Sequence, residues 1–140
     1  MFYGNTIDDT RQLFLISWNK YQHKQPMLPL ENEIAQVILA HPEYHKIIAD
    51  NKSQDHTYYP EFGETNPFLH MGLHLAVREQ IGTNRPIGIE LVYKNLMSKY
   101  KDALTVEHLM MDQLAECLWL AQKNDTPPDE SAYLDRLSHL

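Results

Sequence analysis

The sequence has a single cysteine, Cys117, and no long run of apolar residues. One cysteine cannot form an internal disulfide, and its place in the apolar stretch AECLWLAQ predicts a buried core thiol. No segment approaches the roughly 18 apolar residues that a membrane span needs. The N-terminal MFYGNTIDDTRQ lacks the basic start and apolar core of a signal peptide. We therefore expect a cytoplasmic protein with no membrane partner.

Basic residues are also few, because 12 lysines and arginines face 19 aspartates and glutamates, for a net charge of −7. A general affinity for nucleic acid or for an anionic surface needs a basic face, so neither partner is expected. With 140 residues and 43% hydrophobic content, the chain has the size of one domain, covering residues 1–140. A homo-oligomer is compatible with this composition, and no organic cofactor is predicted.

Helical periodicity and its punctuation by proline predict an all-α fold, a single-domain bundle of about five to six helices. Pro42 must kink or restart the second of these helices. In the fifth, Thr105 is the expected cap. The predicted helices run from Thr6 to before Pro26, from near Pro29 to Ile48, from Asn66 to about Thr83, from about Pro86 to Tyr100, from Thr105 to about Asn124, and from Pro128 onward through Leu137.

Three of the predicted helices carry a pair of metal-binding side chain types four residues apart, in the words HPEYH, HMGLH and HLMMD. Residues with this spacing lie on one face of a helix, so each pair can converge on one metal ion or reach two adjacent ions. Imidazole and carboxylate donors together suit iron or zinc, and helical bundles place such sites in their cores. The predicted ligands are His41, His45, His70, His74, His108 and Asp112, with Glu61 and Glu116 as further carboxylates.

This pattern leaves several functions open. An interior site, mononuclear or dinuclear, suits redox chemistry, binding of O2 or metal sensing. The same histidines suit a metal-free helical interaction module, in which they form a buried hydrogen-bond network. A third alternative is a metal-dependent hydrolase with Glu61 or Glu116 as the base. The zinc-protease mechanism is disfavoured, because Met71 stands where its motif needs a glutamate.

Long words of the sequence resemble the bacterial family called DUF1841. They are HPEYH, YPEFGETNPFLHMGLHLAVREQ, RPIGIELVYKNL, EHLMMDQLAECLWLAQ and PDESAYLDRL, and they cover nearly the whole chain from about Phe14 onward. The resemblance implies a small bacterial cytosolic protein. In donor types and their order the chain is also similar to hemerythrin, whose bundle holds two irons, although the spacing of the motif differs.

Overall fold

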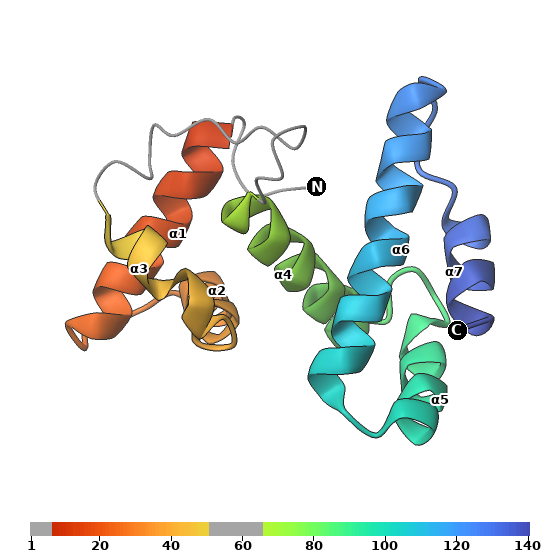
Figure 1. Ribbon diagram of the computed structural model, residues 1–140, viewed down its shortest axis with the longest axis horizontal. Coiled ribbons are helices and arrows are strands. Elements are labelled where there is room, and N and C mark those ends of the chain that lie inside the picture. The colour runs from red at the N-terminus through yellow and green to blue at the C-terminus, as the bar shows by residue number, and fades with distance from the viewer. Residues whose placement is uncertain (1–6, 51–65) are drawn as a thin grey trace. The chain divides into compact units, whose positions relative to one another are not determined.

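The computed structural model describes residues 7–50 and 66–140. In these ranges the chain forms seven α-helices and one 3₁₀-helix and is all-α, as predicted (Figure 1). The chain divides into two compact units, residues 1–75 and 76–140, and the single domain stays a prediction. The helices are α1 (Ile7–Gln22), α2 (Pro29–Leu39), η1 (Pro42–Tyr44), α3 (His45–Ala49), α4 (Pro67–Thr83), α5 (Ile89–Tyr100), α6 (Ala103–Lys123) and α7 (Glu130–Ser138).

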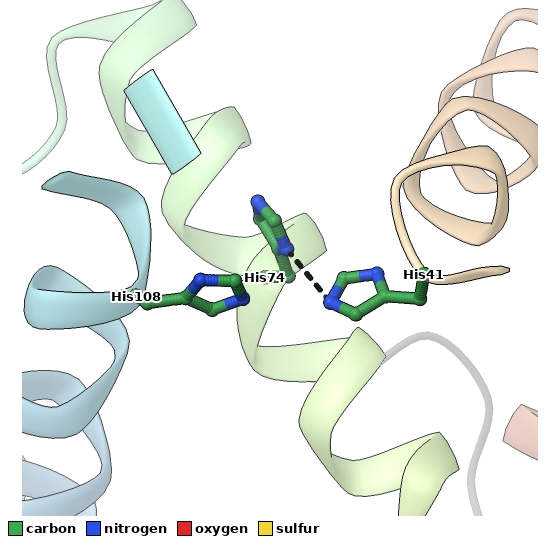
Figure 2. A group of neighbouring side chains, drawn as sticks. All are labelled: His41, His74 and His108. Carbon is green, nitrogen blue, oxygen red and sulfur yellow. Dashed lines mark hydrogen bonds between the residues drawn. The ribbon is translucent and has the colours of Figure 1, made fainter. Parts of the chain in front are cut away.

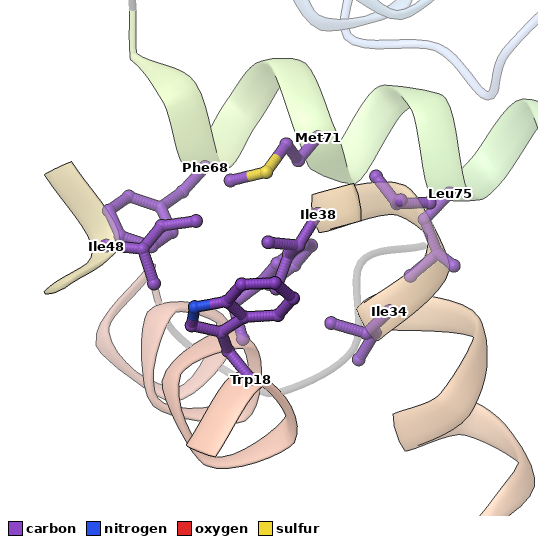
Figure 3. Packing of buried hydrophobic residues seen from close by; sticks show 9 residues of the cluster. Trp18, Ile34, Ile38, Ile48, Phe68, Met71 and Leu75 are labelled. Carbon is purple, nitrogen blue, oxygen red and sulfur yellow. The ribbon is translucent and has the colours of Figure 1, made fainter. Parts of the chain in front are cut away.

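The first unit is built around a core to which α1, α2, α3 and the start of α4 each contribute (Figure 3). Phe14 and Trp18 are buried on α1, whereas Tyr21 is exposed at the end of that helix. Burying side chains of this size stabilises by about 1.5–3 kcal/mol each, before the cost of ordering them. The core residues are Phe14, Trp18, Ile34, Val37, Ile38, Ile48, Phe68, Met71 and Leu75.

Proline at position 42 divides the second predicted helix into three elements, which is why the structure has more helices than predicted. A proline lacks the backbone N–H that would continue the helical ladder, and it disfavours a helical conformation in the residue before it. His41 accordingly leaves the helix, with φ −125° and ψ 64°. The chain then makes one 3₁₀ turn and resumes as the short α3. The turn carries His41 and His45 to different surroundings.

Helix α4 begins as the sequence predicts. The Asn66 side chain caps it, because Oδ1 accepts hydrogen bonds from the backbone N–H groups of Phe68 and Leu69 at 3.0 and 3.2 Å. Pro67 occupies the first helical position, where its missing N–H costs nothing. The helix then runs without a break across residue 75, so it belongs to both units.

The second unit consists of the end of α4 together with α5, α6 and α7. The last three helices contact one another. Its buried side chains include Cys117, as predicted, and Tyr133, whose hydroxyl donates to Oε1 of Gln80 at 2.7 Å. Trp119 is a large side chain of α6 that is not buried, since 54% of its surface is exposed. The ring lies under the Lys123 ammonium group, 5.0 Å from its centroid.

Two helices of this unit start at other residues than predicted. Helix α5 begins at Ile89 because Gly88, at φ 104°, turns the chain, while Asn84 Oδ1 accepts from the N–H of Gly88. In α6 the cap is Asp102, whose Oδ2 accepts from the Thr105 N–H at 2.9 Å and from the Thr105 hydroxyl at 2.6 Å. Thr105 therefore stands in the first turn, and its prediction as the cap is wrong.

The length and polarity of the helices bear on the question of a membrane-spanning segment. Among the residues that the structure describes, none of the helices combines the length and the hydropathy needed to cross a bilayer.

Candidate metal centre

His41 and His74 form the centre of the candidate site, and both belong to the first unit (Figure 2). Their exposed fractions are 1% and 0%, so water does not satisfy their ring nitrogens. The Nδ1 atom of His74 lies 3.3 Å from Nε2 of His41, and the two ring planes are nearly perpendicular, at 89°. Two histidines 33 positions apart in the sequence thus place a ring nitrogen of one beside a ring nitrogen of the other in a buried environment.

The hydrogen on the His41 ring is placed by the backbone of α2. Nδ1 of His41 is 2.8 Å from the carbonyl oxygen of Val37, which can only accept, so Nδ1 carries the hydrogen and donates it. In the neutral imidazole this leaves a lone pair on Nε2, directed at His74. A carbonyl that fixes the tautomer in this way is the usual outer partner of a metal-binding histidine.

The distance between the two nitrogens matches both a hydrogen bond and a pair of metal ligands. Without metal, Nδ1–H of His74 donates to Nε2 of His41. With metal, both nitrogens point lone pairs at the ion, and two bonds of 2.0–2.1 Å at a tetrahedral angle separate their nitrogens by about 3.3 Å. Converting one state into the other requires the His74 hydrogen to move from Nδ1 to Nε2. Each ring must also turn so that its lone pair points at the ion instead of along the line between the two nitrogens.

His70 and Tyr44 complete a cluster of rings around His41. His70, one turn before His74 on α4, lies edge-on to His41 with ring centroids 4.9 Å apart and an interplanar angle of 82°. Tyr44 stacks on His41 at 5.5 Å and 8° and meets His70 at 5.7 Å. Burial, and to a lesser extent the Glu43 carboxylate, raises the pKa of the Tyr44 phenol, which therefore stays neutral at pH 7.

His45 has different partners from His41. Its Nε2 donates to the carbonyl oxygen of Ile38 at 2.8 Å, and its ring packs on Trp18 with centroids 4.8 Å apart. One ring nitrogen is therefore engaged by the backbone, and ligation by His45 stays a prediction.

The remaining predicted donors fall into two groups. His108 is half-buried on α6, whereas Asp112 and Glu116 on the same helix are exposed. All three belong to the second unit. Glu61 lies outside the described residues. Their roles as ligands stay predictions.

Two contacts were not predicted from the sequence, the stacking of Tyr44 in the first unit and an ion pair of Glu107 in the second. Tyr44 had a signal, since it stands three residues after His41 in HPEYH and follows a proline that favours a tight turn. Glu107, beside His108, pairs with Arg78 through Nε and Oε1 at 2.9 Å, and sequence spacing gives no sign of this ion pair. The pair thus engages Glu107, which is the one buried carboxylate among the described residues of the second unit.

Comparison with known proteins identifies a family. No curated protein and no solved structure matches the chain. A family described as a domain of unknown function, DUF1841, matches residues 6–139. The resemblance seen in the sequence words is therefore confirmed, and the chain belongs to the DUF1841 family.

Proposed function

We propose that this protein binds a transition metal, iron or zinc, through His41 and His74. The observation that carries the proposal is the buried approach of two imidazole nitrogens, 3.3 Å apart, with the outer nitrogen of His41 held by the Val37 carbonyl. Neutral imidazoles suit both metals, and such a pair supplies two of the four to six ligands that these metals take.

Further ligands are needed to complete the coordination. His70 is the nearest candidate in the first unit, because its ring already lies against His41. His108, a half-buried histidine of the second unit, is proposed as a further donor on the sequence pattern alone. The carboxylates that we propose only as ligands of a second metal ion are Asp112, Glu61 and Glu116. A site with an open position would suit O2 or redox chemistry, and a filled one metal sensing or structure.

The first test is the metal content of the protein produced without a histidine tag in medium supplemented with iron and zinc. We expect about one metal ion or more per chain in the wild type, and loss of most of it in His74→Ala, because a ligand is removed. The matched control is His139→Ala, since this exposed histidine bonds within its own helix end, for example to the Asp135 carbonyl at 2.7 Å. Its metal content should equal that of the wild type.

The alternative function is a metal-free module in which His74 simply donates to His41. Both readings expect His74→Ala to destabilise the protein, so metal content decides between them. His74→Cys sharpens the comparison, because a thiolate can replace imidazole on zinc or iron but not in a neutral hydrogen-bond network. Absence of stoichiometric metal from the supplemented wild type would refute the metal site.

A further inference from the structure

The turn after Pro42 places a tyrosine ring on one face of His41. In a 3₁₀-helix, side chains three residues apart eclipse one another, and Pro42–Tyr44 is such a turn. The N–H of Tyr44 donates to the carbonyl oxygen of His41 at 2.9 Å, which closes the turn. The stacking of Tyr44 on His41 at 5.5 Å and 8° is therefore a direct product of the local backbone.

The Tyr44 ring is itself held in place. It is half-buried and packs against the core cluster of the first unit, and its edge meets the ring of His70. A ring with these neighbours has few alternative rotamers. The imidazole of His41, which stacks on Tyr44, must therefore lie nearly parallel to the Tyr44 ring.

Two of the contacts of His41 bear on the tautomer and on the plane of its imidazole. The bond from Nδ1 to the Val37 carbonyl fixes the tautomer and one point of the ring. A single hydrogen bond still permits rotation of the ring plane about it. The stacked phenol restricts that rotation on one face of the ring, while the edge contact of His70 and the contact of Nε2 with Nδ1 of His74 act on its other atoms.

We propose that Tyr44 is a positioning residue for the metal site, which holds the plane of the His41 imidazole so that its Nε2 lone pair meets the ion. This inference rests on the proposed function. Tyr44 makes no bond to the metal in this proposal, and its ring, not its hydroxyl, positions the His41 imidazole. Preorganising a ligand in this way increases affinity because less freedom is lost on binding.

The test uses Co²⁺ as the probe, because its visible absorption reports the geometry of its ligands. Metal-free wild type, Tyr44→Phe and Tyr44→Leu are each titrated with Co²⁺. Tyr44→Phe keeps the ring, so it should match the wild type in affinity and spectrum. Tyr44→Leu should bind about 2- to 12-fold more weakly, the equivalent of one aromatic pair, with a changed visible spectrum. If Tyr44 only stabilised the fold, Tyr44→Leu would leave the visible spectrum of the Co²⁺-bound protein unchanged.

A matched control comes from the same unit. Tyr21 stacks on Trp18 with centroids 5.4 Å apart at 12°, a similar arrangement that does not involve His41. Tyr21→Leu should leave the Co²⁺ affinity and spectrum unchanged. If Tyr44→Leu does not fold, which circular dichroism will show, Tyr44→Met takes its place with a side chain of similar reach but no flat ring.

Each outcome bears on a separate claim. A wild type that binds no Co²⁺ overturns both the proposed function and this inference. Binding by the wild type with an unchanged spectrum and affinity in Tyr44→Leu overturns the positioning role alone. Loss of the spectrum in Tyr44→Phe also overturns it, since the hydroxyl would then be the part that acts.

Discussion

A double-mutant cycle on His41 and His74 separates the hydrogen bond between them from a bound metal. The variants are His41→Leu, His74→Leu and the pair together, all compared with the wild type. Both side chains are almost fully buried, so each single change leaves the other imidazole without the partner it has at 3.3 Å. A buried polar group left unsatisfied costs about 1–3 kcal/mol. Replacing both partners by apolar groups of similar size is nearly neutral.

The cycle gives numbers for both states of the protein. Without metal, the two single variants should each lose about 1–3 kcal/mol and the double variant less than their sum. This corresponds to roughly 3–4 °C per kcal/mol in melting temperature for a chain of this length. With metal at 100 times its Kd, the wild type should gain about 2.7 kcal/mol, which is about 8–11 °C. All three variants should lose that gain.

Thermal unfolding followed by circular dichroism, with chelator and with excess Zn²⁺, measures these quantities. If the two rings share a hydrogen bond, the cycle in chelator should give a coupling energy between His41 and His74. If they bind metal, Zn²⁺ should raise the melting temperature of the wild type, and any one substitution should abolish that rise. If the double variant shows the same zinc shift as the wild type, His41 and His74 are not the ligands. If the single variants are additive in chelator, the two rings do not interact.

Two further predictions concern groups away from the metal centre. The Glu31 carboxylate accepts from Lys20 at 2.8 Å and from the Leu28 N–H, which hold its pKa below the ordinary 4.5. The stabilisation that the Glu31 carboxylate provides is therefore complete above pH 4.5 and is lost as pH falls through the lowered pKa. In chemical denaturation between pH 3 and 6, the free energy of unfolding of Glu31→Gln should fall less with acid than that of the wild type. Identical curves would contradict this. Burial raises the pKa of the Cys117 thiol, so a thiol-reactive dye at pH 8 should label the native protein at least about tenfold more slowly than the denatured chain. Equal labelling rates would show that the thiol is accessible.

Local signals explain which helix ends the sequence predicted correctly. At Asn66, a capping side chain and a following proline both act within one turn, and α4 begins there. At α6 two capping residues compete, Asp102 and Thr105. Lys101, the residue before Asp102, ends α5 in the left-handed conformation at φ 60°. A lysine carries no sequence signal for that conformation, in contrast to glycine.

The sequence predicted that three of the histidines would come together, but it did not predict the geometry of their rings. Four-residue spacing on apolar stripes was enough to single out His41, His70 and His74, whose rings gather in the first unit. The same spacing could not show that Pro42 turns the chain between His41 and His45, so that the second ring packs on Trp18 instead. Ring planes and tautomers depend on such turns and on backbone carbonyls, which leave no periodic trace in a sequence.

The two tryptophans offer separate optical reporters for the two units. Trp18 is 7% exposed within the core of the first unit, and Trp119 is 54% exposed on α6 of the second. An indole in an apolar core emits at shorter wavelength than one in water, so the two contributions to the fluorescence spectrum are separable. Trp18→Phe and Trp119→Phe each leave one emitter in place. The pair of variants would therefore show whether denaturant melts both units in one step or one before the other.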